Sequence, residues 1–423
     1  MARIVFAMLE NYASHTASAI ELARRLKEDR HDVVFVGKGH DAQKAVEREG
    51  FSYLQFSADR HIPRLKRRKH AAAALSDLAA DALRILDNDF DLLISDRFNF
   101  IAALVAHKLG KKYIFLQTSL PAADPKSSRF MTGASPEARQ LLQGYLKSRR
   151  LIMAVLNRLK ATAKLLGYSG EDSLCLASGM RASMFCEDSY DFLKVPTIVS
   201  CPRPFDLPQQ HPSHFFFSNI TRPERNEAPF DWSGVNPDHQ VLYISFGSFV
   251  SSKQFPGLYK WLNKVIPELG DWDGWHVIIS MGRAYVAGSI GTTPKNVTVL
   301  GSCPQLTILE RASAMVTHAG INSVVECICA GVPMIAAPMF GDQLGNTGRI
   351  VHHGLGLPFN YRRESIRQLK ERVVEVSGNQ LYRQNLQRMR DECLATRSEA
   401  DPVALIETIL RGCVSEAELR GVA

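Results

Sequence analysis

The chain has 423 residues, of which 45% are hydrophobic and 22% charged, and its formal net charge at pH 7 is +8. This length predicts two or three domains with full cores, and the composition excludes a disordered or fibrous protein. No apolar run approaches the roughly 18 residues of a membrane-spanning helix, and the eight cysteines form no CxxC pair, so we expect a reducing, cytoplasmic compartment and no structural metal.

Strand-like and helix-like segments alternate from the N-terminus onward. Residues 3–9 form an apolar run that predicts a strand; it is too short for a signal peptide, and no small-residue cleavage site follows it. The next predicted elements are a helix at 16–27, strands at 32–37 and 51–56, a helix in the later half of 64–86, a strand at 91–96, a helix at 101–109 and a strand at 113–119. This succession predicts a doubly wound α/β domain.

Two basic segments interrupt the alternation. Residues 64–69 hold Arg64, Lys66, Arg67, Arg68 and Lys69, but no interleaved aromatic residues, so we interpret them as a solvated surface and expect no nucleic-acid partner. Residues 135–168 combine leucines with Lys and Arg at helical spacing. Two interpretations of this segment remain open: helices that pack on the domain, or an amphipathic surface that rests on a membrane. Short strands are expected near 182–186 and 197–201.

A linker and a second α/β unit follow. Residues 221–240 are rich in Pro, Asn and charged residues without periodicity, which indicates an interdomain linker. A strand from Val241 restarts the alternation, which continues to about Cys393, and a final helix is expected near 402–411.

The most informative stretch of the second unit runs from Thr317 to Arg349. An apolar strand ends at Thr317 and His318, and a small-residue turn, 319–320, leads into a segment of helical spacing. Ligands bind at such carboxyl ends of strands in open α/β sheets. A glycine in the turn lets the backbone approach a ligand closely, and the helix start offers unpaired N–H groups to an anion. The stretch therefore predicts a site for an anionic ligand.

The simpler interpretation is that Asn322 and Ser323 only cap the helix. It leaves three features unexplained: His318 before the turn, Glu326 one turn into the helix, and the pair 342–343 after the next apolar run. A site for a larger ligand accounts for all three.

These residues, in this order, resemble the nucleotide-sugar signature of the UDP-glycosyltransferase superfamily. The family pattern is H-x-G-x-N-S, then E, then G-V-P, then D-Q or E-Q, and it matches His318, Gly320, Asn322, Ser323, Glu326, 331–333, Asp342 and Gln343. The resemblance spans nearly the whole chain and is most specific in its second half. It implies the GT-B fold, in which two Rossmann-like doubly wound domains face each other, and inverting transfer of a hexose from a nucleotide sugar.

The resemblance also implies a division of the chain. We expect residues 1–222 to form the N-terminal acceptor-binding domain, 223–240 the linker and 241–395 the C-terminal nucleotide-sugar-binding domain. Residues 396–423 are expected to hold a helix that crosses back and packs on the N-terminal domain.

Inverting transfer needs a base for the acceptor hydroxyl and a positively biased site for the departing diphosphate. His15, just after the first strand, resembles the base of the family's G-H-x-x-P segment, although Ser14 and Ser18 replace its glycine and proline. Asp96 ends a strand at the same sheet edge and matches the carboxylate that would fix the tautomer of this histidine; a helix cap is the alternative. Thr118, 22 residues after Asp96, matches a sugar-contacting threonine.

The remaining site residues carry over from the family by position. The resemblance implies that the diphosphate is bound by the residues around Gly320, namely Ser248, His318, Asn322 and Ser323. It implies that Glu326 binds the ribose, that Asp342 and Gln343 bind the sugar, and that Gln305 binds the nucleobase. Ser302 replaces the family's base-stacking tryptophan, so uridine is expected as the base and thymidine remains open. No metal or other cofactor is expected, because no DxD-type acidic cluster lies near either active edge. His352, His353, Gly354 and Gly356 are interpreted as ordinary residues at a helix end.

The layout is most similar to bacterial glycosyltransferases of small hydrophobic natural products, including carotenoid glucosyltransferases. We therefore expect transfer of a hexose, glucose first, from a UDP-sugar to a hydroxyl of an apolar acceptor. Four alternatives remain: a UDP-sugar epimerase of the same fold, a lipid-acceptor enzyme at the membrane surface, a dTDP-sugar-dependent antibiotic-tailoring enzyme, and a non-catalytic nucleotide-sugar-binding protein. The acceptor and the oligomeric state do not follow from the sequence.

Overall fold

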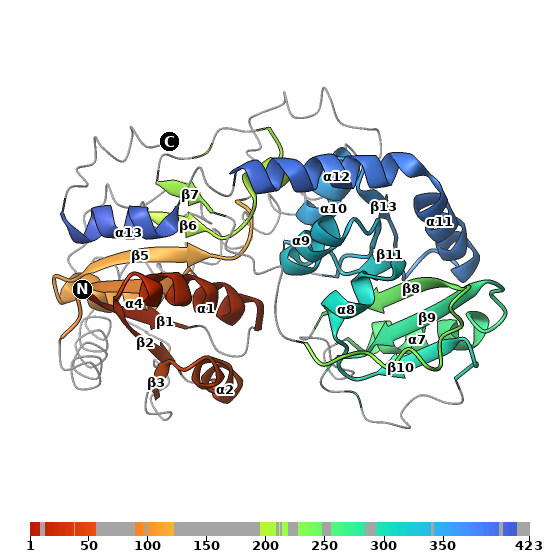
Figure 1. Cartoon of the computed structure of the whole chain (residues 1–423), viewed down its shortest axis with the longest axis horizontal. Coiled ribbons are helices and arrows are strands. Elements are labelled where there is room, and N and C mark those ends of the chain that lie inside the picture. The colour runs from red at the N-terminus through yellow and green to blue at the C-terminus, as the bar shows by residue number, and fades with distance from the viewer. Residues whose placement is uncertain are drawn as a thin grey trace, which may run out of the picture.

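In the computed structural model, two α/β domains lie side by side and the C-terminal segment returns to the first (Figure 1). The structure describes residues 1–8, 13–37, 39–55, 89–97, 100–121, 195–208, 211, 214–218, 227–247, 255–282, 285, 293–339, 342–396 and 401–412. The predictions for the basic cluster at 64–69, the segment at 135–168, the strand at 182–186 and Ser248 lie outside these residues.

The N-terminal domain is a parallel sheet in the order β3-β2-β1-β4-β5-β6-β7. Its strands are β1 (Arg3–Ala7), β2 (Asp32–Gly37), β3 (Ser52–Gln55), β4 (Leu92–Asp96), β5 (Lys112–Gln117), β6 (Thr197–Val199) and β7 (Phe215–Phe217). Its helices include α1 (Ala13–Glu28), α2 (His40–Arg48) and α4 (Phe100–Lys108). The strand order reverses between β1 and β4, which makes their carboxyl ends the switch point where open α/β sheets bind ligands.

The C-terminal domain repeats this design in the order β10-β9-β8-β11-β12-β13. Its strands are β8 (Gln240–Ser245), β9 (Trp275–Ser280), β10 (Val297–Leu300), β11 (Ala312–Thr317), β12 (Met334–Ala336) and β13 (Gly356–Pro358). Its helices are α7 (Pro256–Glu268), α8 (Gln305–Leu309), α9 (Ile321–Ala330), α10 (Gln343–His352), α11 (Ile366–Gly378) and α12 (Gln380–Ala395). Here the order reverses between β8 and β11.

Burial explains why the strands are almost continuously apolar. Parallel sheets are covered by helices on both faces, so both sets of side chains on a strand are removed from water. Four successive residues of β1, Ile4 to Ala7, are buried, as are residues 241–245 of β8. The predicted fold class, two doubly wound parallel-sheet domains, is confirmed.

The interpretation of the Gly354–Gly356 stretch as a helix end was only half right. Gly354 does end α10, with φ of 63° and its N–H bonded to Val351 O. Gly356, however, opens the edge strand β13, which pairs in parallel with β12. A β-carbon at Gly356 would overlap the carbonyl oxygen of Met334, so this strand approaches its neighbour closely enough to need glycine.

Two C-terminal helices connect the domains. α12 runs from the C-terminal domain toward the N-terminal one, and α13 (Pro402–Leu410) lies over the first sheet (Figure 1). Val403, Ile406 and Ile409 of α13 belong to the apolar core that α1 and β1 also form. None of the described helices is both long and apolar enough to cross a membrane.

We predict that Ile406→Ala lowers the free energy of unfolding by roughly 2–5 kcal/mol, because it leaves a cavity in that shared core. Thr408→Ala, on the exposed side of the same helix, is the control and should change stability by no more than about 0.5 kcal/mol. Denaturant unfolding followed by circular dichroism measures both. Equal stabilities of the two variants would show that α13 is not part of the N-terminal core.

Candidate functional site

His15 and Asp96 meet at the switch point of the N-terminal sheet. His15 lies in the first turn of α1 and Asp96 ends β4, so adjacent strands deliver them to the same edge. The distance from His15 Nδ1 to Asp96 Oδ2 is 2.5 Å, and the two side chains are 13% and 4% exposed. α4 begins only at Phe100, so Asp96 is the partner of His15 and not the cap of that helix.

This pairing defines which ring nitrogen can act. A carboxylate accepts the Nδ1–H, and the lone pair of the neutral imidazole then resides on Nε2. The arrangement is that of a histidine base with an orienting carboxylate. Thr118 lies at the same edge, directly after β5, and is buried.

His318 forms the core of the second half of the site. It follows β11, and its ring lies between two glycines: a β-carbon at Gly247 would be 2.9 Å from Nε2, and one at Gly320 would overlap that atom. Ala319 adopts the left-handed conformation with φ of 62°, which is strained for a residue with a side chain. Asn346 Nδ2 donates to Ala319 O at 3.0 Å and holds this turn in place.

Burial lowers the pKa of His318 to about 4, while a hydrogen bond to the backbone of Ser245 opposes the shift. The ring is therefore neutral at pH 7. A neutral ring adds no charge to the site, and its single N–H can serve only one acceptor.

The start of α9 is open toward a ligand. Its N-cap is Gly320, which has no side chain, and no side-chain cap bond is made there. The interpretation of Asn322 and Ser323 as mere caps is therefore wrong; both lie half-buried in the first turn. The unpaired N–H groups and the positive dipole end at this position suit a phosphate.

Gln305 and Glu326 lie together behind that turn. Gln305, the first residue of α8, donates through Nε2 to the carboxylate of Glu326 and, at 3.3 Å, to Ser323 Oγ. The hydroxyl of Tyr243 donates to Gln305 Oε1, also at 3.3 Å. Glu326 is buried, so its carboxylate is an oriented acceptor for hydroxyl groups brought to it.

Asp342 and Gln343 begin α10. Asp342 Oδ2 accepts from Asn346 Nδ2 at 3.0 Å, and Gln343 Oε1 accepts from Met339 N at 2.8 Å. Burial raises the pKa of the Asp342 carboxyl, and the bond from Asn346 and the charges of Arg349 and His15 oppose it.

Ser248 lies outside the described residues. Tyr285 is a candidate site residue that the sequence analysis did not identify. The ring of Tyr285 packs beside Gly301, where a β-carbon would lie 3.5 Å from Cδ1. It is only partly buried, and its neighbour Gly301 directly precedes the exposed Ser302 in the chain. An aromatic residue shortly after β9 is the only sequence signal for it.

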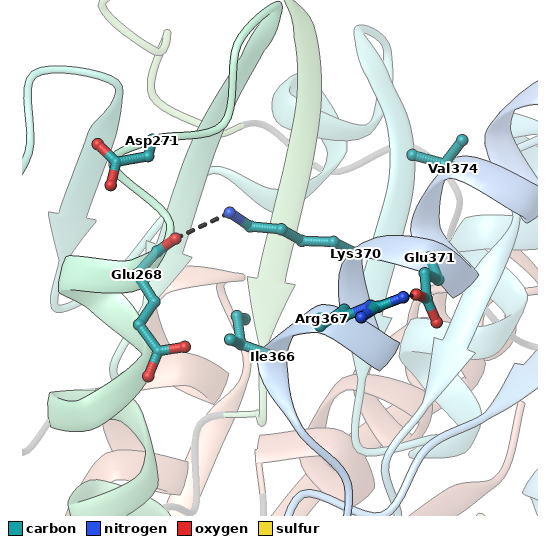
Figure 2. A pocket seen from close by; sticks show the side chains of 7 residues that line it. All are labelled: Glu268, Asp271, Ile366, Arg367, Lys370, Glu371 and Val374. Atoms are coloured by element: carbon teal, nitrogen blue, oxygen red, sulfur yellow. Dashed lines mark hydrogen bonds and ion pairs between the residues drawn. The ribbon is translucent and has the colours of Figure 1, made fainter.

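A hollow on the C-terminal domain lies apart from these residues. It opens between the end of α7 and the start of α11 (Figure 2), and its lining residues are Glu268, Asp271, Ile366, Arg367, Lys370, Glu371 and Val374. Lys370 Nζ donates to Glu268 O, and Arg367 pairs with Glu371 at 2.9 Å. Its cations thus already have partners, and we assign it no ligand. Within the described ranges, no group of three or more His, Cys, Asp or Glu is arranged to hold a metal.

Comparison with known proteins matches the second half of the chain to a family of sugar transferases. The family model "UDP-glucoronosyl and UDP-glucosyl transferase" matches residues 202–393, just under half of the 423 residues. The NDP-glycosyltransferase YjiC of Bacillus subtilis is 28% identical over 229 residues, which are 53% of this chain and 56% of that protein. The match thus spans about half the length of this relative, as it does for other curated relatives.

Solved structures match over the whole chain. The glycotransferase of kitacinnamycin has a TM-score of 0.68 at 23% identity, with 97% of this chain and 99% of that chain covered. The Streptomyces sp. SF2575 glycosyltransferase SsfS6, complexed with thymidine diphosphate, has a TM-score of 0.60 at 16% identity, with 96% and 100% covered. At these identities the likeness establishes the fold, two Rossmann-like domains in the GT-B arrangement.

We predict that His318 in the folded protein does not bind a proton between pH 8 and about pH 5. The pKa of this histidine is near 6.5 in the unfolded chain and about 4 in the folded protein, so between these pH values the unfolded chain binds the additional proton. The contribution of the neutral ring to the free energy of unfolding is therefore complete above pH 6.5 and is lost as the pH falls toward 4. A lowering of this size corresponds to about 3 kcal/mol.

Histidine-selective ¹³C labelling and NMR, with His318→Asn to assign the signal, follow this titration directly. A midpoint near 6.5 for His318 would contradict the buried, neutral ring.

Proposed function

The chain belongs to the UDP-glycosyltransferase superfamily, and on that premise we propose that it transfers a hexose from a UDP-sugar to a hydroxyl of a small apolar acceptor with inversion. The observation that carries the proposal is the pair of half-sites. His15 and Asp96 stand on one domain, and the open helix start at Gly320 stands on the other. α10, which starts directly after Asp342, also contacts the N-terminal domain through Arg349, which supports a single reaction site that both domains share.

In the proposed reaction, Nε2 of His15 takes the proton of the acceptor hydroxyl as its oxygen attacks the anomeric carbon. The bond from that carbon to the diphosphate breaks on the opposite side, which inverts the configuration. Asp96 stabilises the imidazolium that forms, and His15 then releases the proton to solvent. The start of α9 and His318 stabilise the charge on the leaving diphosphate, so we propose that no metal is needed for this step.

The donor assignments rest on chemistry as well as position. The buried carboxylate of Glu326 suits the vicinal hydroxyls of a ribose, and Gln305 beside it suits a nucleobase. Asp342 and Gln343, which lie at the start of α10, suit the hydroxyls of the sugar. The glucose assignment follows from the family, and a small natural-product acceptor agrees with relatives such as the kitacinnamycin glycotransferase.

A dTDP-sugar is the second candidate donor. Ser302 is exposed and offers no ring for uracil, and SsfS6, of the same fold, was solved with thymidine diphosphate. A panel of UDP-glucose, UDP-GlcNAc, UDP-galactose and dTDP-glucose with pooled phenolic and polyketide acceptors, read by mass shift, tests donor and reaction together. Product only with dTDP-glucose would overturn the uridine assignment, and epimerised sugar with donor alone would favour the epimerase alternative.

We predict that His15→Ala lowers kcat for transfer by about 100- to 10,000-fold, because it removes the base, and leaves the Kd for UDP unchanged. Glu326→Ala should mainly raise the Kd for UDP and affect kcat less, because the carboxylate of Glu326 lies in the half-site that we assign to the nucleotide. Steady-state kinetics and titration calorimetry separate the two effects. A wild-type protein that binds UDP without turnover, and a His15→Ala variant that binds it equally well, would favour the non-catalytic alternative.

We propose that Tyr285 supplies the aromatic surface that Ser302 lacks, since its ring stands beside Gly301 at the same loop. Tyr285→Ala should then weaken UDP binding by about 5- to 150-fold, the loss expected for one stacked base. Tyr285→Phe keeps the ring and is the matched control, with an affinity close to that of the wild type. If calorimetry gives the same Kd for UDP with Tyr285→Ala as with the wild type, Tyr285 does not contact the nucleobase.

A further inference from the structure

A buried ion pair joins the two domains behind the site. Arg349 lies on the last turns of α10, and its Nε donates to Asp206 Oδ1 at 2.7 Å. Its Nη2 also donates to Pro121 O at 3.0 Å. Asp206 follows the short helix η3 (Arg203–Phe205), and Pro121 lies a few residues beyond β5. One side chain of the C-terminal domain thus holds two separate segments of the N-terminal domain.

The next turn of the chain adds a second connection. His353 Nε2 lies 3.2 Å from Phe205 O and 3.3 Å from Asp206 O. Burial, and then the neighbouring His352, lower the pKa of His353 to about 4, so the neutral ring donates to these carbonyls. His353 is the C-cap of α10, as expected for a residue at a helix end, and it also connects the two domains.

Both charges of the pair are removed from water. The side chains of Arg349 and Asp206 are 4% and 2% exposed, and Asp206 Oδ2 also lies 3.1 Å from His211 Nε2. A planar guanidinium held on two sides has one preferred geometry, whereas apolar contacts tolerate sliding. The pair therefore restricts how α10 lies against these two segments of the N-terminal domain.

The pair is mechanically connected to both half-sites. Gln343 and Arg349 are six residues apart on one helix, which spans about 9 Å. On the other domain, Pro121 is three residues after Thr118, and β5 is the neighbour of β4, which carries Asp96. The thiol of Cys201 is also buried, and burial is the main reason why its pKa is raised. The charges of Asp342 and Asp206 raise this pKa further, whereas the charge of Arg349 lowers it.

We propose that Arg349 and Asp206 form an interdomain latch, two positioning residues that set the distance between the sugar at the start of α10 and the base His15. The inference rests on the proposed transfer reaction and assigns these residues no contact with substrate. The latch acts on the reaction geometry through α10 and not on the affinity for the nucleotide, whose predicted contacts belong to the C-terminal domain.

The test uses Arg349→Met, which keeps the apolar stem, and Asp206→Asn, which keeps the shape of the side chain. Each should lower kcat for transfer by about 10- to 100-fold, the effect of a small misplacement of reacting groups. The Kd for UDP should stay within about 3-fold, and hydrolysis of the donor without acceptor should fall less than transfer. Arg349→Lys retains the charge but lacks the planar guanidinium, so its kcat for transfer should lie between those of the wild type and Arg349→Met.

Glu407→Gln is the matched control. It removes the negative charge from the contact between Glu407 Oε1 and His31 Nε2, 2.8 Å apart, which also ties the C-terminal segment to the N-terminal domain but does not involve α10. Its kcat should remain within about 2-fold of the wild type, with all rates normalised to the folded fraction from near-UV circular dichroism.

Three outcomes would overturn the latch: a folded Arg349→Met with wild-type kcat, parallel losses of kcat and UDP affinity, or an equal loss in Glu407→Gln. If Arg349→Met does not fold, Arg349→Lys and Asp206→Asn decide by the same criteria. A wild-type enzyme that transfers no sugar from any donor would instead refute the proposed function. Transfer by the wild type, with Arg349→Met equal to it, would refute the latch alone.

Discussion

The relative placement of two sheet edges is the constraint on which this molecule depends. In a parallel sheet every strand ends at the same edge, so each domain gathers its functional side chains at its own switch point. His15 and Asp96 stand at one such edge, and the turn at Gly320 stands at the other. Among the described residues, the His15–Asp96 pair belongs to one domain and the helix start at Gly320 to the other. The buried contacts between α10 and the segments after β5 and β6 hold the two halves in register.

Two histidines illustrate how environment divides one residue type into two roles. His15 is partly accessible and bonded to a carboxylate, which favours the positive charge that a base acquires in the transition state. His318 is buried between two glycines, and burial lowers its pKa to about 4. The first can accept the proton of a substrate hydroxyl, and the second remains neutral beside a charged ligand. The proposed chemistry requires both properties.

Much of this organisation could be predicted from the sequence because it depends on local patterns. Strand and helix periods, and the rule that parallel strands end together, placed His15 and Asp96 at the same sheet edge, and the family resemblance predicted their pairing. The latch could not be predicted, since Asp206 and Arg349 are 143 residues apart and neither lies in a recognisable pattern. The edge strand β13 has only three residues, and its pairing with β12 defines it. Tyr285 was missed because its relation to Gly301 arises from neighbouring strands rather than from spacing.

A single displacement between the two half-sites is the central claim, and product stereochemistry tests it most directly. With a base on one domain and the leaving group on the other, the acceptor oxygen must enter opposite the departing diphosphate. The ¹H NMR spectrum of the product from an α-linked nucleotide sugar, taken before any equilibration, reports the new anomeric configuration. The account predicts the β-linked product. An α-linked product would contradict it, because retention requires a different arrangement of catalytic groups.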